Sequence, residues 1–127
     1  MTPREIVQQA LTDNPGFISA QLLHARMLIG GRRIGLNTVY RVLRELVDAG
    51  KVDVMRDPTG GQLFRLRPGS RHSHYLFCRA CGYSIPIASE FVEHWASTAG
   101  EAHGFVNVEH TIELIGICSE CADAKPR

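Results

Sequence analysis

Residues 37–50 read NTVYRVLRELVDAG, and this stretch decides the fold of the first half of the chain. Its apolar side chains recur at helical spacing, which predicts an amphipathic helix with one buried face. Asn37 or Thr38 is the expected N-cap, and Gly50 is the expected end of the helix. The side chains expected to face the core are Val39, Val42, Leu43, Leu46 and Val47.

The flanking sequence supplies the other parts of a winged helix. Residues 3–11 and 20–29 carry helical patterns, and Ser19 is a good N-cap for the second of them. Residues 51–55 and 62–66 are strand-like on either side of a turn-rich segment. Three short helices followed by a hairpin predict an N-terminal winged helix-turn-helix.

The exposed side of the helix over residues 37–50 carries side chains suited to DNA. A helix in the major groove presents its N-terminal residues to base edges and its dipole to phosphate. Arginine suits phosphate or guanine, while threonine and a tyrosine ring contact thymine methyl groups. An ordinary solvated helix face is the alternative. The predicted DNA-contacting residues are Asn37, Thr38, Tyr40, Arg41 and Arg44.

Four cysteines form two CxxC pairs, Cys78 with Cys81 and Cys118 with Cys121, and no cysteine is left over. Two such pairs supply the four thiolates of a closed, tetrahedral zinc site of the structural type. The 36 residues between the pairs exceed the ~15–20 of a small zinc finger, so the metal would join two ends of a whole subdomain. Two disulfides are the alternative. They require an oxidising compartment, which we do not expect because no apolar signal stretch precedes Thr2.

The second half also predicts regular elements around the cysteines. Strands are expected over residues 75–77, 84–87, 105–108 and 111–117, and Ser89 is expected to cap a helix that ends near Ala102. The side chains expected to be buried by this helix are Phe91, Val92, Trp95 and Ala99.

Charge divides the chain of 127 residues in the same place. The net charge is +1, but residues 1–66 carry nine Lys/Arg against six Asp/Glu, whereas residues 67–127 carry five against seven. All the cysteines and five of the six histidines lie in the second part. A basic first half and an acidic second half rich in metal-ligand residues predict two domains with different tasks.

Residues 34–41, IGLNTVYR, resemble the recognition helix of the ferric uptake regulator (Fur) family. The double CxxC and residues 110–118, HTIELIGIC, are most similar to the zinc-responsive Zur branch of actinobacteria. The resemblance implies an α+β protein: a winged helix-turn-helix over 1–66, a hinge at 67–71, and a small α/β dimerisation domain over 72–127 that contains the structural zinc site. In the family, the residues that match Tyr40 and Arg41 contact DNA.

Two positions depart from the family pattern near the DNA-binding elements. Relatives carry a longer basic segment before the first helix, and we expect its near absence here to remove some phosphate contacts. Asn37 stands where many relatives carry Ala or Thr, which we expect to alter sequence preference.

A second metal site is predicted from His72, His74, Glu93 and His110. Alternate residues of a strand share one face, so the two imidazoles of residues 72 and 74 lie together, and three nitrogens with one carboxylate suit Zn²⁺. Spacing alone leaves an alternative open, in which the two histidines at 72 and 74 lie in a polar linker, Glu93 is a solvated helix residue and His110 lies at the edge of a strand. The resemblance favours the site, because the four positions match an inter-domain metal site of the family. We therefore expect about two zinc ions per chain.

A further regulatory site of the family is predicted to be absent. In Zur-like relatives its ligands match Asp53, Arg67, Ser73 and Tyr75, of which only the aspartate is a good zinc ligand. The iron- and peroxide-sensing branches fit no better, since Phe17, Arg65 and Pro86 stand near their ligand positions. We expect Asp53 to be a surface residue paired with Arg65 or Arg67. The site of His72, His74, Glu93 and His110 is then the expected sensor, which would fix the hinge.

The resulting prediction is a metal-responsive, zinc-sensing transcriptional repressor of metal-homeostasis genes. We expect a homodimer that binds operator DNA in the cytoplasm, with no membrane span because no apolar run approaches ~20 residues. Three alternatives stay open: a regulator of iron, nickel or manganese, a DNA-binding paralogue without sensing, and a hydrolase with zinc on His72, His74 and His110 and Glu93 as base. No separate nucleophile or oxyanion feature supports the hydrolase.

Overall fold

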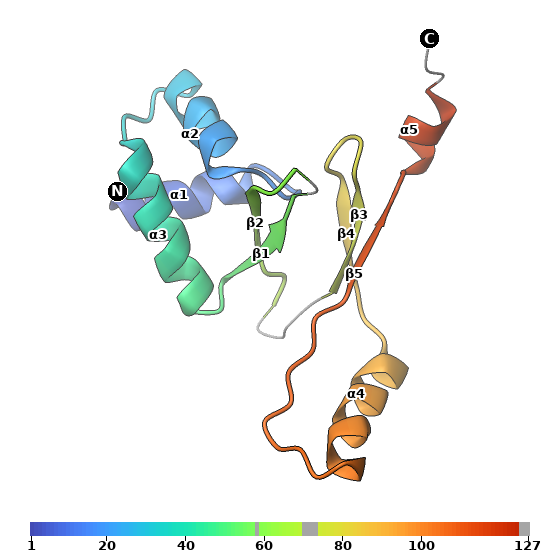
Figure 1. Cartoon of the computed structure of the whole chain (residues 1–127). Helices are drawn as coiled ribbons and strands as arrows, with labels where there is room; N and C mark the ends of the chain where they lie inside the picture. Colours follow the sequence, from blue (N-terminus) through green and yellow to red (C-terminus); the bar gives the residue numbers. More distant parts are fainter. Residues whose placement is uncertain (58, 70–73, 125–127) are drawn as a thin grey trace.

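The computed structural model describes residues 1–57, 59–69 and 74–124. A helical half with a two-stranded hairpin is followed by a three-stranded sheet and two further helices (Figure 1). Among the described residues, no helix has the length and apolarity needed to cross a bilayer. The elements are α1 (Pro3–Thr12), α2 (Ala20–Ile29), α3 (Leu36–Asp48), β1 (Val52–Arg56), β2 (Gln62–Leu66), β3 (His74–Cys78), β4 (Ser84–Ile87), α4 (Glu90–Ala102), β5 (Glu113–Gly116) and α5 (Ser119–Asp123).

The first half has the predicted helices and a single apolar core. Thr2 and Glu5 form a capping box at α1, and the Ser19 hydroxyl accepts the Leu22 N–H at the start of α2. Helix α3 supplies four buried side chains to this core, as its periodicity predicts. The buried members are Val7, Ala10, Leu11, Ile18, Ala20, Leu23, Met27, Val39, Val42, Leu43, Leu46, Val52 and Phe64.

Helix α3 begins earlier than its sequence suggests. The N-cap is Gly35, whose carbonyl accepts the Val39 N–H at 3.0 Å, so the prediction of Asn37 or Thr38 as N-cap is wrong. Glycine supplies the extended backbone of the cap without a side chain. As a result, Asn37 and Thr38 lie in the first turn of α3, with Asn37 exposed.

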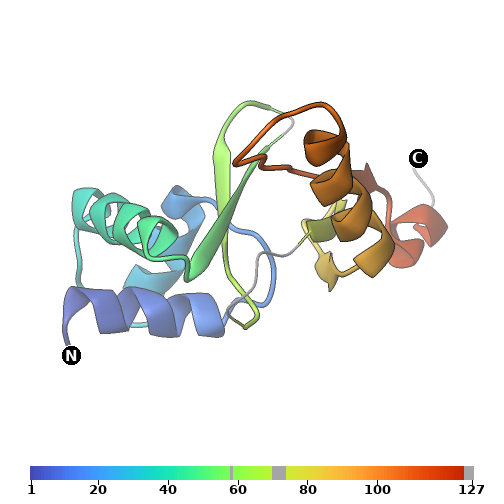
Figure 2. The same cartoon turned by 90° about the horizontal axis from the view of Figure 1, so that it is seen from below.

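Two separate sheets follow α3. Strands β1 and β2 pair antiparallel, with Val52 opposite Leu66, and Ile18 forms a bridge to Phe64. The second sheet has the order β4-β3-β5, in which β3 pairs antiparallel with β4 and parallel with β5. Seen from below, the hairpin of β1 and β2 lies between the helical half and the end of the molecule that holds α4 and α5 (Figure 2).

Helix α4 has the predicted bounds, but the prediction of its buried face is wrong. Phe91 is 81% exposed and Trp95 62% exposed, whereas the buried residues of the helix are Ala96 and Gly100. A Cβ at Gly100 would lie 2.5 Å from a methyl group of Val108, so the inner face is sterically restricted to a small residue. The large apolar face of α4 therefore points away from its own chain.

The strand predicted over residues 105–108 is not formed. Among the described residues, this segment is irregular, and Asn107 has a φ of 55°. Of the strand predicted over 111–117, only Glu113–Gly116 pairs with a neighbour, β3. Alternation of apolar residues alone does not provide the partner strand that a β-strand requires.

Candidate functional site

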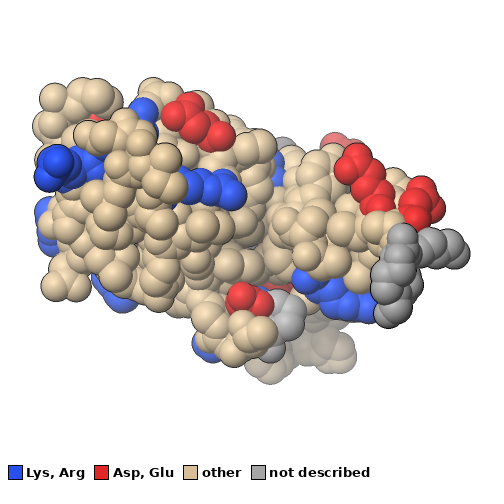
Figure 3. All heavy atoms as spheres, turned by 90° about the horizontal axis from the view of Figure 1, so that it is seen from above, with Lys and Arg blue, Asp and Glu red and all other residues tan. Residues whose placement is uncertain are grey.

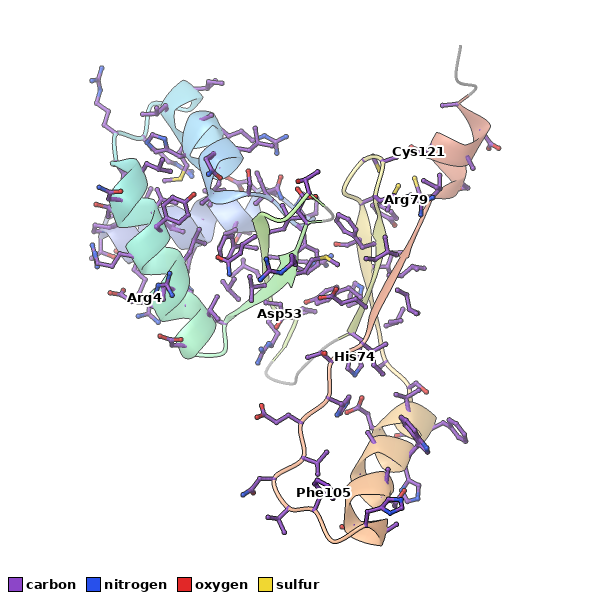
Figure 4. The ribbon with its side chains drawn as sticks, in the orientation of Figure 1. Arg4, Asp53, His74, Arg79, Phe105 and Cys121 are labelled. Carbon is purple, nitrogen blue, oxygen red and sulfur yellow. The ribbon has the colours of Figure 1, made fainter. Side chains whose placement is uncertain are left out.

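The four cysteines converge at one end of the second sheet (Figure 4). Cys78 ends β3, Cys81 lies in the turn that follows, and Gly82 closes this turn with a φ of 84° and an N–H bond to the Cys78 carbonyl. Cys118 is the N-cap of α5, and Cys121 lies within that helix. Sequence spacing predicted this cluster, and the parallel pairing of β3 with β5 brings its two halves together.

The donor atoms of this cluster fit a tetrahedral zinc ion. The four Sγ atoms lie within 4.8 Å of one another, and the sulfurs of Cys81 and Cys118 are 3.7 Å apart. Zn–S bonds of ~2.3 Å in tetrahedral geometry separate two sulfurs by about 3.8 Å, whereas a disulfide requires ~2.05 Å. All four cysteines are unbridged, so the arrangement is that of a metal site and not of two disulfides.

Backbone amides and crowding shift the thiol pKa values in opposite directions. The Cys118 N–H donates to the Cys78 sulfur at 3.3 Å and is the main cause that lowers the pKa of Cys78 to about 6. Hydrogen bonding to Cys118 and then to Cys81 raises the pKa of Cys121 to about 12. Four thiols this close cannot all ionise without a cation between them, because the thiolates repel one another. A divalent ion at the centre would offset this repulsion.

The second cluster is formed by His74, Glu93 and His110. The Nε2 atoms of His74 and His110 are 3.2 Å apart, and Glu93 Oε2 lies 2.8 Å from the first and 3.0 Å from the second. His74 is buried, while Glu93 is exposed at the first turn of α4. Hydrogen bonds from His110 and then from His74 lower the pKa of Glu93, so this carboxylate stays ionised.

Two imidazole nitrogens and a carboxylate oxygen at a common point are ligands of the types that zinc binds. With Zn–N bonds of ~2.0–2.1 Å, two tetrahedral ligands lie about 3.3 Å apart, which is close to the 3.2 Å between the two Nε2 atoms. The fourth predicted ligand, His72, lies outside the described residues, as do Ser73 and the last two residues of the predicted hinge, 70 and 71.

The two clusters occupy opposite ends of one strand. His74 is the first residue of β3 and Cys78 is the last, so about 13 Å of strand separates the Cα atoms of these two residues. The cysteine cluster joins β3 to the chain after β5, whereas the His74 cluster joins β3 to α4 and to the chain before β5.

Asp53 is not the surface residue that the sequence suggested. Its side chain is only 11% exposed; Oδ1 accepts bonds from Nε and Nη2 of Arg67, both at 2.8 Å, and Oδ2 accepts the Tyr75 hydroxyl at 2.6 Å. The expected pairing with Arg67 is confirmed, but Arg65 binds elsewhere. Asp53, Arg67 and Tyr75, three of the four positions of the family site that was predicted to be absent, are thus joined by an ion pair and a hydrogen bond. The contact with Tyr75 was not predicted, because this partner lies 22 residues from Asp53 along the chain.

The side chains predicted to contact DNA share the outward side of α3. Asn37, Tyr40, Arg41 and Arg44 are exposed and Thr38 is half-buried. Arg41 pairs with Glu45 at 3.1 Å within the helix. Figure 3 shows Lys and Arg side chains at several points on the half of the molecule that contains α1–α3.

The known proteins to which this chain is similar all belong to one family. The model of the ferric uptake regulator family matches residues 1–115. The zinc uptake regulation protein of Mycobacterium tuberculosis is 41% identical over 118 residues, which cover 93% of this chain and 90% of that relative. The ferric uptake regulation protein of Legionella pneumophila is 32% identical over 120 residues, which cover 94% of this chain and 88% of that protein.

Solved structures of regulators have the same fold. The Vibrio cholerae ferric uptake regulator superposes with a TM-score of 0.72 at 29% identity, over 93% of this chain and 90% of the other. A zinc uptake regulator of M. tuberculosis superposes with a TM-score of 0.53 at 41% identity, over 93% and 91%. The chain therefore belongs to the ferric uptake regulator family.

Proposed function

We propose that this protein is a zinc-responsive transcriptional repressor that binds operator DNA as a homodimer and controls metal-homeostasis genes. Its family is one of regulators and not of enzymes, so the hydrolase alternative is set aside. A relative with 41% identity is a zinc uptake regulation protein, and the Vibrio cholerae relative is described as having DNA-binding domains. Operator binding places its action in the cytoplasm.

The observation that carries the proposal is the difference between the two donor sets at the ends of β3. Four thiolates form a closed shell, which is typical of a structural zinc ion. His74, Glu93 and His110 offer nitrogen and oxygen donors, from which an ion exchanges more readily than from four thiolates. We therefore assign scaffolding to the cysteine cluster and sensing to the His74 cluster.

The sensing residues connect three parts of the second half. His74 opens β3, Glu93 lies in the first turn of α4, and His110 precedes β5, so an ion shared by them ties α4 to the sheet. In a dimer that uses α4, this tie sets the distance between the two α3 helices. That distance must match half-sites one helical turn apart or a multiple of it.

Replacing His110 by alanine tests the sensing role. Zinc is expected to strengthen operator binding by the wild-type protein by about 10–100-fold, because coupling free energies between sites are ~1–3 kcal/mol. His110→Ala is expected to bind DNA with the weak affinity of the metal-free protein whether or not zinc is added. Fluorescence anisotropy with a DNA duplex selected by the zinc-loaded protein from a random library measures this, alongside zinc content by elemental analysis.

His94→Ala is the matched control, since His94 is an exposed histidine of α4 outside the cluster. It is expected to respond to zinc as the wild type does. Equal DNA binding by the wild type with and without metal would contradict sensing and support a paralogue that only binds DNA. Titrations with Ni²⁺, Co²⁺, Mn²⁺ and Fe²⁺ test the regulator-of-another-metal alternative, because donor type alone does not separate these ions.

Arg44→Ala tests the role of α3 in DNA binding. Loss of one phosphate contact is expected to weaken binding about equally for all DNA sequences and to reduce the slope of log affinity against log salt by about 1 per chain. Arg79→Ala removes the same charge near the cysteine cluster, far from α3, and is expected to leave affinity unchanged (Figure 4). Equal affinities and salt slopes for Arg44→Ala and the wild type would argue against α3 as the DNA-binding helix.

A further inference from the structure

Two arginines take part in the contact between the hairpin and the second sheet. They are Arg65 in β2 and Arg67, which follows the end of that strand. Arg65 lies in β2, and its Nη1 donates to the Ser84 carbonyl at 2.9 Å and to the Ser84 hydroxyl at 2.6 Å. Ser84 is buried at the start of β4. This guanidinium therefore crosses from the DNA-binding half to the second sheet and satisfies a buried polar group there.

Arg67 acts through Asp53. Its guanidinium holds Oδ1 of Asp53, which leaves Oδ2 to accept the Tyr75 hydroxyl of β3. Burial, followed by the hydrogen bond to Asp53, raises the pKa of Tyr75, so the hydroxyl keeps the proton that it donates. Both carboxylate oxygens are thus occupied, one from each side of the contact.

The ring of Tyr75 also contacts residues of the first half of the chain. Phe17 meets it edge-on with centroids 4.9 Å apart, and the Arg65 guanidinium carbon lies 5.0 Å from the ring centroid. Met55 of β1 and Phe77 of β3 complete a small buried cluster with these two aromatic residues. Apolar packing, cation–π contact and charge-assisted hydrogen bonds therefore coincide at one place.

We propose that Asp53, Arg65, Arg67, Tyr75 and Ser84 form a metal-independent lock between the DNA-binding half and the second sheet. We call these five residues the hairpin–sheet junction. It fixes the orientation of α3 relative to the sheet before any metal binds. The described ligands of the sensing cluster all belong to the second half, so metal there changes the arrangement of α4 and the dimer while the junction stays closed.

Rotational diffusion of the two halves tests the junction. In the zinc-loaded, full-length protein, ¹⁵N relaxation is expected to give one rotational correlation time for the amides of α1–α3 and of β3–β5. In Arg65→Met/Tyr75→Phe the amides of α1–α3 are expected to tumble faster than those of β3–β5. Arg56→Met is the matched control, because the one hydrogen bond of the Arg56 side chain among the described residues goes to the Gly60 carbonyl of its own hairpin. It must keep a common correlation time.

The sensing site provides the second arm of the test. His110→Ala, which retains the cysteine cluster, must keep the common correlation time of the wild type. Independent tumbling of the two halves in His110→Ala would show that the metal site controls the junction and would overturn the proposal. A common correlation time in Arg65→Met/Tyr75→Phe would overturn it as well.

Tyr75→Phe alone guards against a general loss of folding in the double variant. It removes one oxygen and keeps the ring contacts, so amide hydrogen exchange in β1 and β3 is expected to accelerate several-fold with zinc content unchanged. Exchange rates equal to those of the wild type would refute the Asp53 contact. Operator affinity, expected to fall about tenfold in the double variant, depends on the proposed function, whereas tumbling and exchange do not. The two proposals can therefore fail separately.

Discussion

Replacing Cys118 by serine is expected to unfold the second half of the chain and to lower the zinc content by about one ion per chain. Few apolar side chains in the described part of this half are buried: Tyr75, Phe77, Cys78 and Ala96. The two aromatic rings pack on the hairpin and on Phe17, so the second half has little core of its own. The parallel pairing of β3 with β5 joins only four residues of each strand, and the cysteine cluster lies at its end.

The expected size of this effect follows from the free energy of structural zinc. Binding is worth ~10–16 kcal/mol in zinc-finger peptides, which equals or exceeds the ~5–15 kcal/mol stability of a whole domain. Circular dichroism, thermal unfolding and elemental analysis check the result, with Ser119→Ala as the neighbouring control. A Cys118→Ser protein with wild-type zinc content and unfolding temperature would contradict the structural role. Unfolding of the wild type by reductant but not by chelator would revive the disulfide alternative.

Introducing lysine at Phe91 is expected to split the homodimer. Phe91 and Trp95 are one helical turn apart on α4, and both are largely exposed in the single chain. The sheet adds a second apolar surface, where Leu76 lies between its exposed neighbours Ile85 and Leu114 on β4 and β5. Exposed patches of this kind mark association surfaces, and a buried lysine without a partner is strongly unfavourable there.

The dissociation constant of the dimer is expected to rise at least about 100-fold in Phe91→Lys, since central aromatic residues of interfaces contribute ~2–4 kcal/mol or more. DNA affinity falls with it, because the second half-site no longer benefits from a linked partner. Sedimentation velocity measures the mass, and Ser97→Lys places the same charge on another face of α4 as a control. A dimeric Phe91→Lys protein would mean that α4 does not form the interface.

The predictions that were confirmed depend on residues close together in the sequence. Helix α1 and helix α2 follow their caps and apolar spacing, and α3 buries the residues that its period selects. The CxxC spacing identified all four members of the cysteine cluster, because two thiols two residues apart converge in any tight turn. Three of the four residues proposed for the second site also converge, although spacing alone left that site open.

The errors have a common physical origin. The period of α4 correctly located an apolar face, but the pattern cannot say whether that face packs on its own chain or on a second copy. Residues 105–108 alternate like a strand but pair with no other strand among the described residues. Asp53 was expected at the surface, and two contacts from residues distant in sequence bury it instead.

The sequence by itself determined the family, the winged helix and the cysteine cluster, because each depends on residues close together along the chain or on a fixed spacing. Only the tertiary structure decided that the two candidate metal clusters lie at opposite ends of β3, and that Asp53 forms an ion pair with Arg67 and accepts a hydrogen bond from Tyr75. These features arise from side chains that the strands bring together across tens of residues, and their geometry is fixed by packing, which no local pattern encodes.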